Sequence, residues 1–268
     1  MHSTQNPASV LRSANSQLES LRMMRRQELL SRSRASEPHE IPQFNETSLS
    51  RLEKCVIDTF QCGDEATVYQ YVRQLAVVVG ANKDCVTFFM NRTIPFILDH
   101  QEALFKPDFI TQVHKTDDRL LLRLAEIFAD ISVANTLVVE ILYRHRVVDL
   151  TFNLLSQSDI VVESTLFILG NLLGASVIIR NDFLRRGIVP VLLQIAGWFP
   201  DKLLLFSHLS WIFANICIGT PVPDVADIAP FFPLFERFFT VNTEAILQEA
   251  LTAAYCLYKT PVYFKVLE

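Results

Sequence analysis

Apolar residues recur at helical intervals along most of the chain, and the pattern repeats in blocks. Four short segments with the same apolar spacing end at residues 130, 171, 215 and 256, which are 41, 44 and 41 residues apart. Each is followed by a polar turn and a further apolar stretch that a small residue or proline interrupts. Periods near 40 residues are typical of helical solenoids, because each unit buries its apolar face only by stacking on its neighbours. The sequence therefore predicts an all-α protein of stacked helical repeats.

The repeats are expected to fill residues 49–268 as about four to five units, with a more diverged unit at about 64–100 and an incomplete last one. No polar cap is evident at the last unit, so the chain is either a fragment or ends irregularly. Residues 1–48 are rich in Ser, Asn, Gln and Arg, and end in a Pro-containing stretch typical of a linker. We expect this arm to be partly disordered, either as a solvated tail or with a short amphipathic helix that forms on binding.

Charge divides unevenly between the two parts. Residues 1–36 hold six Arg and two Glu, a balance of +4, which leaves −9 for the remainder of a chain whose net charge is −5. A basic arm beside an acidic body favours a contact of the arm with its own body or with an acidic partner. The modest net charge gives no reason to expect nucleic acid as a direct partner.

Few residues point to catalysis. The chain has 7 Gly, lacks the P-loop, G-x-S-x-G and H-E-x-x-H motifs, and carries six scattered His. Its five Cys include no C-x-x-C pair, which indicates reduced thiols in a cytosolic or nuclear protein and no zinc site. We therefore expect no enzyme activity, no metal, no cofactor and no small-molecule substrate.

One stretch is long enough to raise the question of a membrane. Residues 203–223 contain no Asp, Glu, Lys or Arg, and 21 residues can nominally span a bilayer. The stretch also carries several polar residues, and a buried repeat helix that ends at Gly219-Thr-Pro221 explains them better than a membrane span. We expect no membrane insertion, and a membrane-associated helical protein is the alternative from another class.

Two of the repeats and the arm carry a family resemblance. Residues 169–174 with 180–193, and residues 209–217 with Trp211 and Asn215 four apart, resemble consecutive repeats of importin-α, the armadillo-repeat adaptor of nuclear import. Residues 21–34 are similar to the latter part of that family's importin-β-binding segment. The resemblance covers most of the chain at low identity. It implies an armadillo-repeat, right-handed superhelical solenoid.

The spacing of Trp and Asn supports a binding role. Residues four apart lie one above the other on a helix face, so their repetition is expected to form a ladder along a concave surface. Each Asn would bond the backbone of an extended peptide, while aromatic faces clamp Lys or Arg stems. The alternative is a core aromatic with an amide satisfied inside the protein. The predicted peptide-binding groove residues are Glu126, Asp130, Phe167, Asn171, Trp211 and Asn215.

The chain departs from the family pattern at several ladder positions. The Trp position is kept in one of four repeats and the Asn position in two. In the last repeat, Thr252 stands at the Trp position and Cys256 at the Asn position. Ala175 stands where the family has an acid that pairs with the key lysine of the signal. Glu126 and Asp130 are candidates to supply a compensating charge one repeat away. The groove is therefore either altered in specificity or degenerate.

The resemblance implies an adaptor that binds nuclear-localisation-signal cargo in the groove and importin-β through the arm, in the cytoplasm and nucleus. An armadillo scaffold with a degenerate groove and no import role is the alternative within the same fold. The predicted importin-β-binding residues are Arg22, Arg25, Arg26, Arg32 and Arg34.

Overall fold

The computed structural model describes residues 45–62, 65–81, 83–105, 119–133 and 136–259. The chain divides into two units, 1–43 and 44–268, and the described residues all belong to the second. The predicted arm, 1–48, thus lies almost entirely outside the described residues, although the first described helix already begins at Glu46.

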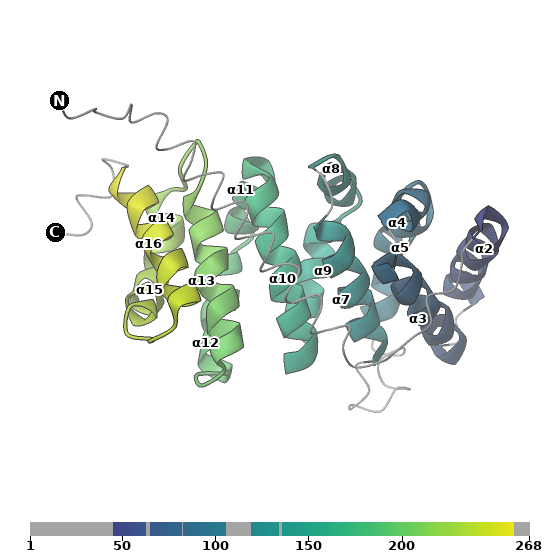
Figure 1. The fold of residues 1–268 in the computed structure, drawn as a ribbon, viewed down its shortest axis with the longest axis horizontal. Coiled ribbons are helices and arrows are strands. Elements are labelled where there is room, and N and C mark those ends of the chain that lie inside the picture. Colours follow the sequence, from purple (N-terminus) through teal and green to yellow (C-terminus); the bar gives the residue numbers. More distant parts are fainter. Residues whose placement is uncertain (1–44, 63–64, 82, 106–118, 134–135, 260–268) are drawn as a thin grey trace, which may run out of the picture. The chain divides into compact units, whose positions relative to one another are not determined.

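Helices make up all the regular secondary structure of the described residues, which confirms the all-α prediction (Figure 1). In chain order they are α2 (Glu46–Cys62), α3 (Glu65–Ala81), α4 (Lys83–Met90), α5 (Thr93–Asp99), η1 (Gln101–Phe105), α7 (Arg119–Ser132), α8 (Thr136–Arg144), α9 (Val147–Leu155), α10 (Asp159–Ala175), α11 (Val177–Arg185), α12 (Ile188–Trp198), α13 (Leu203–Cys217), α14 (Val225–Ile228), η2 (Ala229–Phe231), α15 (Phe232–Phe238) and α16 (Glu244–Tyr258).

From α4 onward these helices form repeats in which short helices precede a longer last one, and α2 and α3 form a pair of equal length before them. The last helices of these units are α3, α7, α10, α13 and α16, and each packs along the next in this order. We call them the ladder helices, because the four segments found by sequence spacing end on α7, α10, α13 and α16. Figure 1 shows α2 and α16 at opposite ends of this stack. The predicted solenoid of stacked helical repeats is therefore confirmed.

Within a repeat, the turn between the two short helices fixes their crossing. Gly187 separates α11 from α12 with a φ of 78°, a left-handed conformation that glycine adopts without the steric penalty other residues meet. The break in the apolar pattern at this residue therefore ends one helix and starts the next.

A buried arginine holds the end of α13. The side chain of Arg180, on α11, is fully buried, and its Nη1 donates hydrogen bonds to the carbonyl oxygens of Ile218 (2.6 Å) and Ile216 (3.3 Å). Its Nη2 donates to the carbonyl oxygen of Pro221. The last carbonyls of a helix lack partners within the helix and carry partial negative charge. The Arg180 guanidinium donates hydrogen bonds to these carbonyls and places a positive charge beside them. It thereby connects α11, the first helix of the repeat, to the end of α13.

Helix α13 occupies most of the charge-free stretch 203–223. It ends at Cys217 after 15 residues, and Arg180 binds the carbonyls that follow. Across the described ranges, no helix combines the length and apolar character needed to cross a membrane.

Two glycines on α10 receive two side chains from α13. A Cβ placed on Gly170 would collide with the six-membered ring of the Trp211 indole, and one placed on Gly174 would lie 3.1 Å from Nδ2 of Asn215. The ring of Phe167, one turn before Gly170, lies 5.8 Å from the Trp211 ring, centroid to centroid. The missing side chains at 170 and 174 therefore provide the space that lets the two ladder helices approach.

We expect Gly170→Ala to lower the free energy of unfolding by about 2 kcal/mol or more, because the methyl group overpacks a rigid buried indole. Gly197→Ala is the matched control: a Cβ there meets nothing within 4 Å, so the same change should be neutral or stabilise by about 0.5–1 kcal/mol. Urea denaturation measures both. Equal destabilisation by the two substitutions would show that the loss comes from glycine itself and not from the contact with Trp211.

Candidate functional site

The six predicted groove residues lie on three successive ladder helices. Glu126 and Asp130 are on α7, Phe167 and Asn171 on α10, and Trp211 and Asn215 on α13. The structure brings the Phe167 and Trp211 rings into contact, as the ring distance given above shows. Their role in binding a peptide stays a prediction.

Each ladder asparagine uses its amide donor between repeats. Nδ2 of Asn215 donates a hydrogen bond to the carbonyl oxygen of Gly170 (2.9 Å), and Nδ2 of Asn171 donates to Oγ of Ser132 (2.9 Å). Asn171 is 1% exposed and Asn215 is 2% exposed. The two amides therefore connect α7 to α10 and α10 to α13.

The side-chain oxygen of each ladder asparagine, unlike its nitrogen, has no described hydrogen-bond partner. Oδ1 of Asn171 and Oδ1 of Asn215 are buried and have no hydrogen-bond partner among the described residues. Leaving a buried acceptor unsatisfied costs about 1–3 kcal/mol. Two successive ladder helices thus each hold a buried acceptor without a described hydrogen-bond partner.

The aromatic side chains differ from the expectation drawn from the sequence. Trp211 is 3% exposed and Phe167 is 5% exposed, so neither offers the open aromatic face expected to clamp a lysine stem. The reason is the glycine at 170, which lets the indole sink against α10. In this arrangement Trp211 contributes to the packing of the repeats.

The acids of α7 and α10 are only partly available. Glu126 forms an ion pair with Arg123 on its own helix (2.8 Å), which offsets the charge assigned to it as compensation for Ala175. Asp130 is half-buried. The sequence reasoning missed Glu163, which lies one turn before Phe167 on α10. Burial raises the pKa of the Glu163 carboxyl, Lys202 opposes this shift and Asp159 adds to it.

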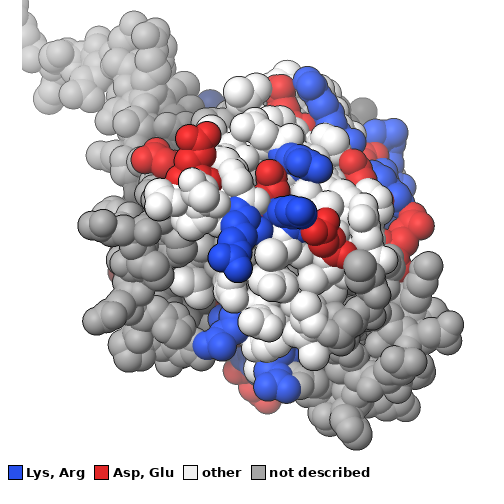
Figure 2. All heavy atoms as spheres, turned by 90° about the vertical axis from the view of Figure 1, so that its right-hand side faces the viewer, with Lys and Arg blue, Asp and Glu red and all other residues white. Residues whose placement is uncertain are grey.

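Charge on the α2 end of the stack is mixed. Figure 2 shows basic and acidic side chains interspersed over the described surface there, with uncharged patches between them. Attraction for a charged partner at this end would therefore come from particular side chains and not from a broad field of one sign.

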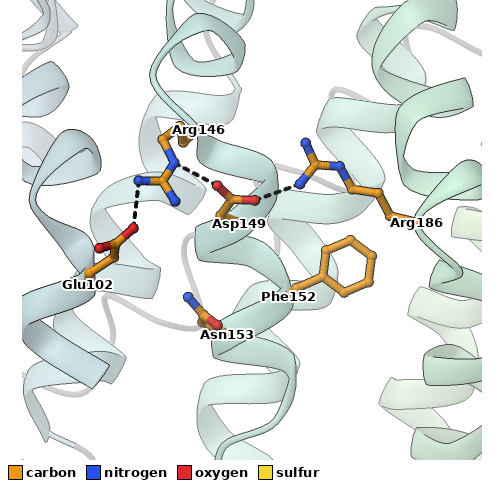
Figure 3. Close-up of a pocket in the computed structure, with 6 residues that line it drawn as sticks. All are labelled: Glu102, Arg146, Asp149, Phe152, Asn153 and Arg186. Atoms are coloured by element: carbon orange, nitrogen blue, oxygen red, sulfur yellow. Dashed lines mark hydrogen bonds and ion pairs between the residues drawn. The ribbon is translucent and has the colours of Figure 1, made fainter. Parts of the chain in front are cut away.

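A second cluster of charged residues lies around the start of α9 (Figure 3). It lines a hollow of about 420 Å³. Asp149 accepts hydrogen bonds from Nε of Arg146 (2.7 Å) and from Nη1 of Arg186 (2.6 Å), and Arg146 also donates to Glu102 (2.9 Å). The hollow is lined by Glu102, Arg146, Asp149, Phe152, Asn153 and Arg186.

These ion pairs join neighbouring repeats. Arg146, with a φ of 66°, precedes the second helix of its repeat just as Gly187 does in the next repeat. Burial alone would raise the pKa of Asp149, but the hydrogen bonds from Arg146 and Arg186 outweigh it and hold that pKa below its ordinary value. Both guanidinium groups are paired with carboxylates, among them the shared Asp149, so the cluster is best explained as a connection between repeats and not as an anion site.

The described residues contain no group of three or more His, Cys, Asp or Glu placed to hold a metal ion. Cys217 is buried, and burial raises the pKa of its thiol, which makes it a poor nucleophile. The predicted importin-β-binding residues, Arg22, Arg25, Arg26, Arg32 and Arg34, lie outside the described residues.

Comparison with known proteins supports the class of the fold. The chain is similar to a designed armadillo repeat protein in complex with the peptide (KR)4, with a TM-score of 0.59 and 12% identity over 79% of this chain and 92% of that one. It is equally similar to computationally designed armadillo repeat proteins for modular peptide recognition (TM-score 0.59, 12% identity, the same coverage). The chain therefore has the all-α armadillo solenoid fold.

One curated relative matches part of the sequence. Importin subunit alpha-2 of Arabidopsis thaliana is 32% identical over 116 residues, which are 42% of this chain and 21% of that protein. The matched stretch is thus about a fifth of the relative's length. No protein-family model matches the sequence.

We expect Asp149→Asn to lower the free energy of unfolding by about 1 kcal/mol at pH 7, because two guanidinium groups lose their shared carboxylate. A carboxyl whose pKa is depressed by folding contributes stability above its unfolded pKa, near 3.9, and loses it as the pH falls through the folded value. The difference from wild type should therefore shrink at pH 3. Urea denaturation at both pH values measures it, with the exposed Asp201→Asn as control. A difference of the same size at pH 3 would contradict an ionic origin.

Proposed function

We propose that this protein is an armadillo adaptor that binds extended basic peptide segments along α7, α10 and α13. The observation that carries the proposal is the pair of buried, unpartnered Oδ1 atoms on Asn171 and Asn215. A main-chain N–H is the donor that an extended peptide offers at regular intervals.

The spacing of the ladder suits such a peptide. Packed helices lie about 8–10 Å apart, and an extended chain advances about 3.3 Å per residue. Acceptors on adjacent ladder helices would therefore meet the N–H groups of every second or third peptide residue. An extended segment that crosses the ladder helices could bond Asn171 and Asn215 together.

Partly buried acids favour a basic peptide. Asp130 lies one helical turn after Glu126 on α7, and Glu163 lies on α10. Burial penalises the carboxylate form of Glu163, so a lysine or arginine side chain beside it would restore part of the lost solvation energy. The designed relative in complex with (KR)4 is consistent with basic segments as ligands for this fold.

The partial match to an importin α subunit supports a role in nuclear import. In that role the ladder would bind cargo that carries a nuclear-localisation signal. The arm, through Arg22, Arg25, Arg26, Arg32 and Arg34, would bind importin-β, and the protein would act in both the cytoplasm and the nucleus.

A scaffold for another protein, without an import role, is the second candidate. The observation that favours it is the burial of Trp211 and Phe167, because side chains that pack between repeats are less able to clamp lysine stems. The two candidates differ in whether a basic peptide binds at all.

We expect a Lys-rich peptide to bind the wild-type chain weakly in titration calorimetry, and its alanine counterpart not to bind. Ala175→Asp places an acid at the end of α10 and should tighten binding about five- to thirty-fold, or about 1–2 kcal/mol. Gln194→Glu adds the same charge at an exposed position of α12, away from the ladder, and should change the affinity little. If neither wild type nor Ala175→Asp binds the Lys-rich peptide, the adaptor proposal fails and the scaffold takes its place.

The amide contacts are tested on the peptide, which leaves the protein's packing intact. N-methylation of alternate residues of the Lys-rich peptide removes main-chain donors without changing its charge. The loss of each hydrogen bond to an Asn oxygen should weaken binding by about 1 kcal/mol, roughly five-fold. Equal affinity of all methylated peptides would mean that charge alone holds the ligand.

Arm binding gives an independent prediction. Changing Arg25 and Arg26 to Ala together should weaken binding to importin-β at least several-fold at physiological salt, where charges interact over about 8 Å. Fluorescence anisotropy with the full chain and purified importin-β measures it. Changing Arg185 and Arg237 to Ala, both exposed on the solenoid, is the charge-matched control. Unchanged affinity in the arm variant would mean that the likeness of residues 21–34 is one of composition alone.

A further inference from the structure

The last described ladder helix, α16, presents a regular stripe of exposed side chains. Leu251 is 60% exposed, Tyr255 is 47% exposed and Tyr258 is 66% exposed. Two exposed polar residues, Glu244 and Gln248, precede them on the same face. The five positions are spaced by four, three, four and three residues, which is the spacing of contact positions in helices that pair along their length. All other residues of α16 are buried or half-buried. The stripe consists of Glu244, Gln248, Leu251, Tyr255 and Tyr258.

On the inner ladder helices this face is covered. The residues of α13 that lie 41 positions before Leu251, Tyr255 and Tyr258 are all buried, and so are the corresponding residues of α10. The next ladder helix packs against each of these two helices, and on α10 Gly170 faces Trp211 of α13. The stripe on α16 therefore occupies the position of the stacking face of the inner ladder helices, and its Leu251 and Tyr255 side chains are exposed. The covered residues are Ser210, Ala214 and Cys217 on α13 and Leu166, Gly170 and Leu173 on α10.

The stripe differs in side-chain size from the stacking faces of the inner ladder helices. Gly170 and Ala214 keep the corresponding position small, and the first of them admits an indole from the next helix. Tyr255 fills that position on α16. Large amphipathic side chains that bury apolar area and keep a polar end are enriched at interfaces between proteins. Tyr255 therefore suits a contact with a separate molecule.

We propose that this stripe pairs two copies of the chain through an antiparallel contact of their α16 helices. Leu251 lies at the centre of α16, which runs from Glu244 to Tyr258. A two-fold axis at Leu251 brings this side chain against its own copy, and carries Tyr258 and Lys259 to the first turn of the other helix. A surface of this symmetry is complementary to itself.

Charge at the two ends fits the antiparallel orientation. Glu244 is exposed in the first turn, and Lys259 is exposed just after the last turn, over the ring of Tyr255 (4.7 Å). The antiparallel pair places Lys259 of each copy near Glu244 of the other, and opposes the two helix dipoles. A parallel pair would place like charges together at both ends, which is repulsive. The charges therefore select the two-fold arrangement.

The contact is small, so the dimer is expected to be reversible. Buried aromatic side chains contribute about 150–250 Å² each, and the exposed parts of Leu251 and the two tyrosines amount to roughly 300 Å² per copy on that scale. The two copies together would bury about 600 Å², which is below the range of stable specific interfaces and typical of a weak, transient contact. The pair would leave α7, α10 and α13 uncovered in both copies, and so present two ladders to a partner with repeated basic segments, which raises avidity. The dimer does not depend on the proposed function.

Sedimentation velocity of the full chain, from low to high micromolar concentration, tests the proposal. The sedimentation coefficient of wild type should rise from the monomer value to the dimer value. Leu251→Glu should stay monomeric, because it places two carboxylates on the axis. Leu137→Glu, at a similarly exposed leucine on α8, should dimerise like wild type. Circular dichroism melts confirm that each variant is folded.

A charge exchange separates this pairing from other contacts. Lys259→Glu should weaken the dimer at least several-fold, and Glu244→Lys in the same chain should restore it by recreating opposite charges between copies. A wild-type chain that is monomeric at every concentration overturns the proposal. So does a Leu251→Glu chain that dimerises normally, because the contact must then lie elsewhere.

Discussion

The close fit of each ladder helix on the next is the constraint on which the rest of the structure depends. It is clearest where Gly170 and Gly174 on α10 receive Trp211 and Asn215 from α13. Once the indole is seated, the Asn215 amide lies within reach of the Gly170 carbonyl oxygen, and its donor is used there. The same fit turns one face of every inner ladder helix into an interface, and so makes the exposed stripe of α16 distinctive. The stability of the stack, the candidate site and the proposed dimer surface all follow from one mode of packing.

The fold was accessible from the sequence because the apolar pattern returns about every 40 residues, and a unit of that length can bury its apolar face only against a neighbour. The ladder positions 171 and 215 followed from the same register. The contacts between repeats could not be predicted from the sequence, because they depend on how far one helix is shifted along the next. Neither the glycine that hides Trp211 nor the bond from Asn171 to Ser132 has a signature within its own repeat. The pairs around Asp149 likewise depend on the turn conformation of Arg146.

Packing and binding compete for the same side chains in this solenoid. The side-chain amide of each ladder asparagine has a donor and an acceptor. Its N–H donor forms the hydrogen bond that holds adjacent repeats together. The oxygen side is buried and unpartnered, a state that lowers stability until a donor arrives. Trp211 and Phe167 belong wholly to the packing. In the proposed complex the ladder helices would therefore hold a peptide mainly through its backbone and through a few acids, with little contribution from the aromatic side chains.

The central claim is that the oxygens of Asn171 and Asn215 accept hydrogen bonds from the backbone of a bound peptide. Nuclear magnetic resonance of the side-chain amides measures this most directly, in a titration of the full chain with a Lys-rich peptide. The account predicts that the signals of both amides shift along one saturation curve, while those of Asn153 and Asn242, which lie off the ladder helices, stay in place. Saturable binding of the peptide with both ladder amide signals unmoved would contradict it.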